Sequence, residues 1–125
     1  MSDIRELTKK INKWVAERGW EPAQKPKDLA ISLSLEAAEV LEHFQWKNDR
    51  KVAKHIRENK EELADELADV AIYLLKLADK TKINLGSAIE SKLVKASKKY
   101  PVKVVKGNSK VYYRLKKLAR SKRTH

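Results

Sequence analysis

Residues 60–81 read KEELADELADVAIYLLKLADKT, and this stretch decides the fold class. Apolar side chains recur at spacings of three and four, which places them on one face of a helix. No glycine or proline interrupts the pattern. The stretch therefore predicts a long amphipathic helix whose apolar face packs against other helices. Its apolar stripe consists of Leu63, Leu67, Val70, Leu74 and Ala78.

The same periodicity predicts further helices on both sides. Asp28, Asp49 and Asn84 stand where N-caps are expected, because their side chains accept hydrogen bonds from the free N–H groups of a first turn. The proline at position 101 disfavours helical geometry in the residue before it and so ends the last main helix. Helices are expected at residues 3–18, about 28–46, about 50–58, 60–81 and 84–100.

The pattern changes after Pro101. Residues 102–105 read VKVV and predict a short extended piece, Gly107-Asn108-Ser109 is typical of a turn, and residues 110–121 predict a short helix. No alternation long enough to build a sheet is present. The sequence therefore predicts an all-α fold, most simply a helical bundle.

Length and composition fit one globular domain. The chain has 125 residues, of which 42% are apolar and 37% charged, and no cysteine, so disulfides and zinc–thiolate sites are excluded. No apolar run approaches the roughly 20 residues of a membrane span, and the N-terminus lacks the hydrophobic stretch of a secretory signal. A cytoplasmic protein is expected.

The net charge of +12 comes largely from one end of the chain. Residues 101–125 hold nine Lys or Arg and no acid, whereas the first hundred hold twenty basic and seventeen acidic residues. A nearly balanced body thus precedes a basic tail. Such a tail favours contact with a polyanion, so a nucleic-acid-binding module acting through it is an alternative function.

Four carboxylates lie at the borders of apolar stripes. Glu36 and Glu39 are three apart on the helix expected at 28–46, and Glu66 and Asp69 are three apart on the next long helix. Four such groups near a bundle core would repel one another unless a cation neutralised them. Mg²⁺ prefers oxygen ligands and commonly bridges carboxylates to phosphates, so these residues predict a magnesium site.

Acids at this spacing also occur on solvated helix faces and in di-iron carboxylate bundles. Glu-rich helices are common, so the spacing alone does not distinguish a metal site from a solvated face. A di-iron bundle uses Glu-x-x-His on two helices, and no histidine here has a glutamate three residues before it. The sequence therefore disfavours a di-iron centre, while the solvated-face alternative stays open.

The paired acids stand in a wider motif. Glu36-Ala37-Ala38-Glu39 followed by Glu66-Leu67-Ala68-Asp69 resembles the E-x-x-E…E-x-x-D signature of the MazG-like, all-α nucleoside triphosphate pyrophosphatases. Flanking stretches match as well, and two of them, FQWK at 44–47 and RGW at 18–20, look closest to the dCTP pyrophosphatase-like branch. The other matching flanks are LEHFQWK at 41–47, ADVAIYLL at 68–75, Lys92, KYP at 99–101, Gly107 and Lys110.

The resemblance implies a fold and a reaction. The fold would be a four-helix MazG-like bundle in residues 1–106, followed by a basic tail in residues 107–125, and assembled as a homodimer or homotetramer. The reaction would be hydrolysis between the α and β phosphates of a (d)NTP, giving a nucleoside monophosphate and pyrophosphate, in the service of nucleotide-pool sanitation. Mg²⁺, with Mn²⁺ as a substitute, would be held by Glu36, Glu39, Glu66 and Asp69. Either Glu36 or Glu39 would activate the attacking water.

The resemblance also assigns roles to residues outside the acid pairs. Lys92 and Tyr100 would bind phosphate oxygens, and Trp20 and Trp46 would flank the base. Each also fits a purely structural role, as a surface group for the first two and as a core or interface residue for the tryptophans. His43 lies on the same flank of its helix as Glu36 and Glu39, where it either joins the site or packs between helices.

Three positions depart from the dCTP pyrophosphatase-like pattern. Ala96 stands where that branch usually has an asparagine, Ile11 about where a polar base contact is expected, and Gln24 where a histidine is common. Base selectivity therefore does not carry over with the metal site. A nucleoside triphosphate substrate is expected, with dCTP-like pyrimidines slightly favoured.

Overall fold

The computed structural model describes residues 3–107 and 109–123, with side chains through Ser121. Every regular element in these ranges is helical, which confirms the predicted all-α class. No helix in the same ranges is both long and apolar enough to cross a bilayer. In chain order the elements are α1 (Ile4–Glu17), η1 (Glu21–Ala23), α2 (Pro26–Glu42), α3 (Asp49–Glu58), α4 (Lys60–Lys80), α5 (Leu85–Lys99), α6 (Val102–Val105) and α7 (Ser109–Arg123).

The chain divides into two compact units, Met1–Leu85 and Gly86–His125. The first contains α1 to α4, and the second contains nearly all of α5 together with α6 and α7. This division reflects packing within the chain. The boundary predicted at residue 107, between a MazG-like domain and a basic tail, stays a prediction.

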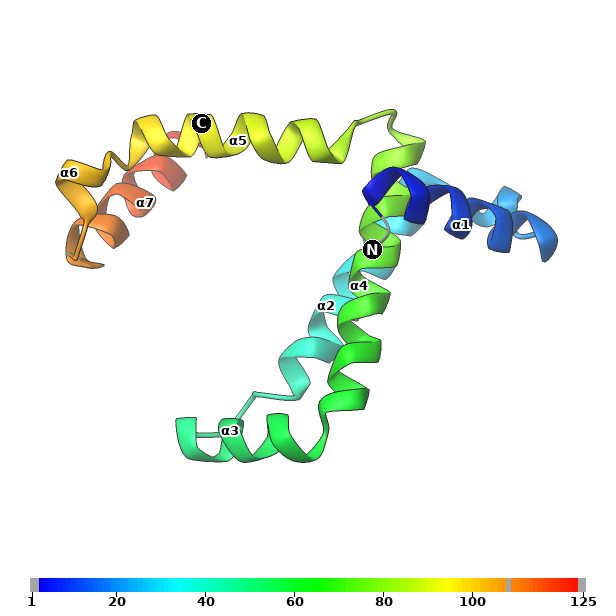
Figure 1. Ribbon diagram of the computed structural model, residues 1–125, viewed down its shortest axis with the longest axis horizontal. Coiled ribbons are helices and arrows are strands. Elements are labelled where there is room, and N and C mark those ends of the chain that lie inside the picture. Colours follow the sequence, from blue (N-terminus) through cyan, green and yellow to red (C-terminus); the bar gives the residue numbers. More distant parts are fainter. Residues whose placement is uncertain (1–2, 108, 124–125) are drawn as a thin grey trace. The chain divides into compact units, whose positions relative to one another are not determined.

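In the first unit α4 is the central helix. α2 runs antiparallel along it, and α1 and α3 also pack against it (Figure 1). The most buried apolar side chains come from three of these helices, namely Val15 of α1, Leu29 of α2, and Leu75 and Ala78 of α4. Burial of each such valine or leucine side chain stabilises the fold by roughly 1.5–3 kcal/mol.

The buried face of α4 differs from the predicted stripe. Leu75, which the stripe omitted, is 9% exposed, whereas Leu67 and Leu74 are 51% and 39% exposed. The apolar surface of α4 is wider than α1, α2 and α3 together cover, so part of it stays open in the single chain. The helix itself was predicted almost to the residue.

Both ends of α2 were predicted wrongly. The helix begins at Pro26 with Lys25 in the N-cap position, and Asp28 lies inside the first turn. Proline is favoured at the first helical position because its fixed φ suits the helix and its missing N–H is not needed there. The helix ends at Glu42 rather than near residue 46. Residues 43–46 form a turn, in which Trp46 has a φ of 68°, a value outside the helical region.

Two short segments also differ from expectation. α3 is capped by Asn48, whose Oδ1 accepts from Lys51 N at 2.9 Å, and Asp49 is the first helical residue. Residues 102–105 form the helix α6 rather than an extended piece. With no neighbouring strand to pair with, their N–H groups are satisfied locally, for example by Val104 N donating to Pro101 O at 2.9 Å.

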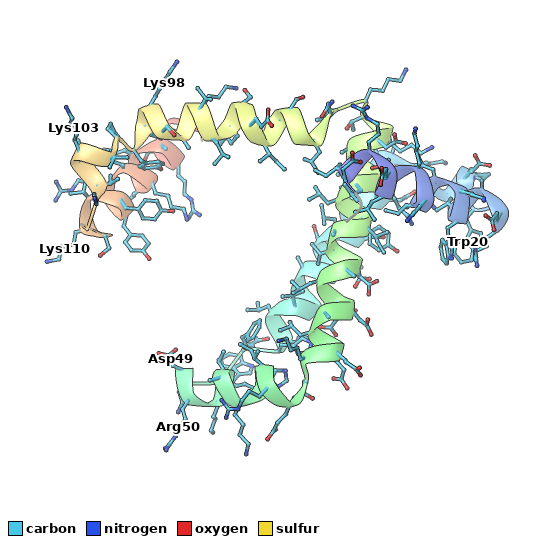
Figure 2. The ribbon with its side chains drawn as sticks, in the orientation of Figure 1. Trp20, Asp49, Arg50, Lys98, Lys103 and Lys110 are labelled. Atoms are coloured by element: carbon cyan, nitrogen blue, oxygen red, sulfur yellow. The ribbon has the colours of Figure 1, made fainter. Side chains whose placement is uncertain are left out.

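In the second unit α6 packs against α7, and the basic helix predicted at 110–121 is found as α7. Tyr100 and Tyr112 pack with ring centroids 5.3 Å apart, and Tyr112 contacts Tyr113 at 5.2 Å. Lysines project outward from this unit, among them Lys98, Lys103 and Lys110 (Figure 2). The turn predicted at 107–109 includes Asn108, which lies outside the described residues.

Candidate functional site

The packing of α2 against α4 brings the two acid pairs together. Burial, a hydrogen bond that protonated Glu36 donates to the Glu39 side chain, and the negative charges of Glu39, Asp69 and Glu66 all raise the pKa of Glu36. Glu39, Glu66 and Asp69 therefore all lie close enough to Glu36 to act on its charge. The repulsion expected from the sequence is present in the fold.

The donor set of this cluster suits a hard divalent cation. Oε2 of Glu36 is buried and has no hydrogen-bond partner. An unpartnered buried carboxylate oxygen beside other carboxylates is unfavourable for the protein alone, and a cation would offset it. As placed, the described side chains form no ready group of three or more convergent ligands. The fit rests on charge and oxygen donors, and the metal-binding roles stay predictions.

A cavity of about 590 Å³ adjoins the acid cluster within the first unit. It lies between α1, the segment after α1, the start of α2 and the middle of α4, and Asp69 and Trp20 both line it. Trp20 follows α1 (Figure 2) and meets Trp14 edge to face, with ring centroids 5.2 Å apart. Asp69 thus belongs both to the acid cluster and to an aromatic cavity large enough for a nucleoside.

Two of the three departures noted in the sequence line this cavity. Ile11 contributes from α1 and Gln24 from the segment before α2. The third departure, Ala96, lies in the second unit. The cavity wall therefore differs chemically from the dCTP pyrophosphatase-like pattern at two positions, Ile11 and Gln24, that would contact a bound ligand.

Lys76 is a cavity residue that sequence reasoning missed. Its side chain lines the cavity from α4, its Nζ lies 4.8 Å from the ring centroid of Tyr73, and desolvation lowers its pKa from the usual 10.5. The sequence could have indicated that Lys76 lies near Asp69, because a spacing of seven residues places both on one face of α4.

Trp46 lies apart from this cavity. It occupies the turn after α2, and its side chain is 92% exposed. The cavity wall contains Trp14 and Trp20 but not Trp46. A single chain therefore does not bring the two predicted base-flanking tryptophans together.

The predicted phosphate ligands belong to the second unit. Lys92 is exposed on α5, and Tyr100, which follows that helix, packs its ring against Tyr112 of α7. The packing contact gives the tyrosine ring a structural role and leaves its hydroxyl group unassigned. Phosphate binding by Lys92 and Tyr100 stays a prediction.

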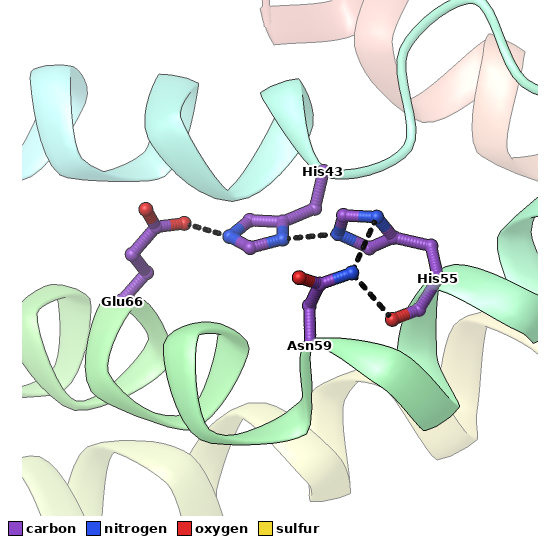
Figure 3. Close-up of polar contacts among 4 residues, drawn as sticks. All are labelled: His43, His55, Asn59 and Glu66. Atoms are coloured by element: carbon purple, nitrogen blue, oxygen red, sulfur yellow. Dashed lines mark hydrogen bonds and ion pairs between the residues drawn. The ribbon is translucent and has the colours of Figure 1, made fainter.

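A row of polar contacts leads away from Glu66 (Figure 3). Nε2 of His43 forms an ion pair or hydrogen bond with Glu66 Oε2, and Nδ1 of His43 lies 2.6 Å from Nε2 of His55. Asn59 Nδ2 lies 3.2 Å from His55 Nδ1 and 3.2 Å from the main-chain oxygen of His55. His43 is only 7% exposed. The sequence pattern did not indicate that α3 folds back to place His55 beside His43.

Part of the chain matches a known protein family. Residues 31–115, more than half of the chain, match the MazG-like family. The chain belongs to the MazG-like family. The matched range includes all four carboxylates, both halves of the predicted phosphate site, and α3.

Individual relatives are similar over most of this MazG-like chain. It is 36% identical to dCTP pyrophosphatase 1 of Rattus norvegicus over 114 residues, which are 90% of this chain and 65% of that protein. For dCTP pyrophosphatase 1 of Homo sapiens the identity is 34% over 117 residues, 92% of this chain and 67% of that protein. This chain thus spans slightly less than two thirds of the length of the rat relative.

A solved structure supports the fold. The crystal structure of a pyrophosphatase from Archaeoglobus fulgidus DSM 4304 superposes with a TM-score of 0.75 and 38% sequence identity. The match covers 81% of this MazG-like chain and 94% of that chain. The all-α architecture is therefore that of a solved relative named as a pyrophosphatase.

Proposed function

We propose that this chain is a Mg²⁺-dependent nucleoside triphosphate pyrophosphohydrolase. It hydrolyses the bond between the α and β phosphates of a (d)NTP and gives a nucleoside monophosphate and pyrophosphate. The observation that carries the proposal is the position of Asp69, which lines the aromatic cavity and also acts on the pKa of Glu36. A base in the cavity would have its phosphates beside the acid cluster. The names of the relatives support the reaction class.

The family motif and the negative charge of the cluster support the following roles for the four acids. Glu36, Glu39, Glu66 and Asp69 would hold the metal, with Mn²⁺ able to replace Mg²⁺. Bound there, the cation would polarise phosphoryl oxygens and offset their charge. Either Glu36 or Glu39 would orient the attacking water and accept its proton, a role worth typically 10²–10⁴-fold in rate.

The cavity supplies binding of the nucleoside. The indole of Trp20 offers a face or edge to the base, worth about 1–3 kcal/mol if the base stacks on it. Lys76 adds a partly desolvated donor for carbonyl oxygens of the base. Because Ile11 and Gln24 alter the wall, we expect base preferences that differ from those of the dCTP pyrophosphatases, with pyrimidines slightly favoured.

The exposed apolar surface supports assembly as a homodimer or homotetramer. Ile31 and Leu35, one turn apart on α2, are 50% and 62% exposed, and Leu67 on α4 is 51% exposed. Apolar side chains clustered on helix faces commonly mark protein–protein contacts. A second copy would also be the source of Trp46 at a given site. We further propose a cytoplasmic location and a part in nucleotide-pool sanitation.

The test is hydrolysis measured with a panel of NTPs and dNTPs in Mg²⁺, for wild type, Glu39→Gln and Glu42→Gln. Glu42 is exposed on α2, one turn beyond Glu39, and serves as the matched control. Pyrophosphate release should fall about 100-fold or more in Glu39→Gln and stay near wild type in Glu42→Gln. Equal losses in both variants, or no turnover by wild type with any nucleotide, would overturn the proposal.

A second candidate function rests on α7. Its described part carries exposed Lys110, Arg114, Lys117 and Arg120, and Tyr113 is 65% exposed. Such a helix would bind nucleic acid through phosphate contacts, with steep salt dependence. Deleting residues 107–125 separates the functions. If only polynucleotide affinity disappears, the tail binds nucleic acid, and if hydrolysis or oligomer size changes, the tail supports the enzyme.

A further inference from the structure

The contacts around Glu66 allow only one arrangement of protons. The main-chain oxygen of His55 can only accept, so the Asn59 group 3.2 Å from it is the amide N–H₂. The same nitrogen lies 3.2 Å from His55 Nδ1, which must therefore accept. A neutral imidazole that accepts at Nδ1 carries its proton on Nε2.

The tautomer of His55 in turn determines the tautomer of His43. His55 Nε2 lies 2.6 Å from His43 Nδ1, a separation that holds one proton and not two. Because His55 donates, His43 Nδ1 accepts, and the proton of His43 lies on Nε2. His43 Nε2 is the ring atom in contact with Glu66 Oε2, so that proton lies at this contact. Every ring nitrogen in the row has a single role.

The row joins three helices at the end of the first unit. Asn59 stands between α3 and α4, His55 is on α3, His43 follows α2, and Glu66 is on α4 (Figure 3). His43 is buried, so water does not compete for its ring nitrogens. The contact engages Oε2 of Glu66, the carboxylate that the sequence assigns to the metal.

We propose that His43, His55 and Asn59 are positioning residues that fix the orientation of Glu66 for metal binding. The inference rests on the proposed function, since it takes Glu66 as a metal ligand. Residues that hydrogen-bond a ligating carboxylate orient it before the metal arrives, and losing such a partner typically lowers metal affinity 10–100-fold. His55 acts on Glu66 indirectly, by holding His43 in the tautomer that carries its proton on Nε2.

The first test reads the tautomers directly in metal-free protein. ¹⁵N NMR of the imidazoles, assigned with single His→Gln variants at a pH where both rings are neutral, should show the Nε2–H tautomer for His43 and for His55. In Asn59→Leu the His55 signal should shift toward a mixture of tautomers. The contacts from Asn59 through His55 and His43 to Glu66 are called the relay below. An Nδ1–H tautomer at either ring in the wild type would overturn the relay, whatever the protein's activity.

The second test measures Mn²⁺ affinity by EPR of the free ion. His55→Leu should bind Mn²⁺ about 10-fold or more weakly, whereas His55→Gln, whose amide N–H can still donate to His43, should recover most of the affinity. Lys54→Leu is the matched control, because Lys54 is the neighbouring residue on α3 and its side chain is 66% exposed.

The outcomes separate this inference from the proposed function. Wild-type binding of Mn²⁺ with equal affinity in His55→Leu, His55→Gln and Lys54→Leu would overturn the relay and leave the function standing. A wild type that bound no Mn²⁺ would overturn the metal-dependent function, and with it the purpose assigned to the relay. Loss in His55→Leu with recovery in His55→Gln would support the relay over a general packing role, which the glutamine would not restore selectively.

Discussion

Trp20 and Trp46 lie at opposite ends of α2, one before η1 and the other in the turn beyond the helix. The 17 residues of α2 separate them by a helix about 25 Å long, at roughly 1.5 Å per residue. In one chain the two side chains do not line the same cavity. If both contact the base, each site takes Trp20 from one chain and Trp46 from another.

This arrangement predicts complementation between two impaired variants. Trp20→Ala and Trp46→Ala should each raise KM, about 10-fold for a lost stacking contact of roughly 1.4 kcal/mol. Mixed in equal amounts with full subunit exchange, they should rebuild about a quarter of the sites as wild type if the unit is a two-fold dimer. KM and the active-site fraction measured before and after exchange provide the check. Unchanged kinetics after proven exchange would place both tryptophans in one chain's site or remove Trp46 from it.

Trp46 also allows a test of stability against function. Its φ of 68° is a left-handed conformation, which disfavours a residue with a Cβ by roughly 1–2 kcal/mol. Because the side chain is 92% exposed, little packing is lost when it is removed. Trp46→Gly should therefore unfold at higher urea concentration than Trp46→Ala, by about 1 kcal/mol in the free energy of unfolding, while both variants bind substrate equally weakly. If the alanine variant were the more stable one, the strain at this position would be absent.

The raised pKa of Glu36 predicts the pH dependence of stability without metal. The folded-state pKa lies above the 4.5 of a free carboxyl group, so the folded protein favours the protonated form. The stability gained from this protonation is present below pH 4.5 and is lost as pH rises through the folded pKa. At neutral pH in a chelator, Glu36→Gln should therefore be more stable than wild type, and the difference should shrink toward pH 4.5. Thermal unfolding at the two pH values measures this.

Bound metal should reverse the order of stability of wild type and Glu36→Gln. Added Mg²⁺ binds the folded state and should raise the unfolding temperature of wild type more than that of Glu36→Gln, which lacks one ligand charge. Hydrolysis by Glu36→Gln should be lower by about 10²-fold or more. A variant that was less stable than wild type in chelator would show that Glu36 is not under repulsion.

Lys76 should affect both stability and base preference. Desolvation lowers its pKa, so the charged amine destabilises the folded state at neutral pH, and this effect disappears as pH rises from the folded pKa toward 10.5. Lys76→Met should therefore raise the free energy of unfolding at neutral pH. It should also lower kcat/KM by about 10-fold or more for bases that accept a hydrogen bond from Nζ, and less for others. An equal loss of kcat/KM for every nucleotide would exclude recognition of the base by Lys76.

The sequence predicted those features that depend on local pattern. The apolar spacing in residues 60–81 predicted α4, and the two i, i+3 acid pairs predicted carboxylates that meet between α2 and α4. Helix ends were predicted less well. Pro26 begins α2 and Asn48 caps α3 for local reasons that compete with the nearby Asp28 and Asp49, and α2 ends early because residues 43–46 form a turn.

Other features depend on tertiary packing and were not predicted. The contact of His43 with His55 requires α3 to fold back beside the end of α2. The entry of Lys76 into the cavity depends on how α1 crosses α4, which spacing along one helix does not determine. The degree to which Leu67 stays exposed depends on the number of helices that cover α4, a property of the whole assembly.

The identity of the products tests the central claim most directly. ³¹P NMR of one dNTP incubated with the protein should show pyrophosphate and the deoxynucleoside monophosphate appearing in equal amounts with Mg²⁺, and no reaction in chelator. Orthophosphate with a nucleoside diphosphate, or turnover that persists in chelator, would contradict a metal-dependent cleavage between the α and β phosphates.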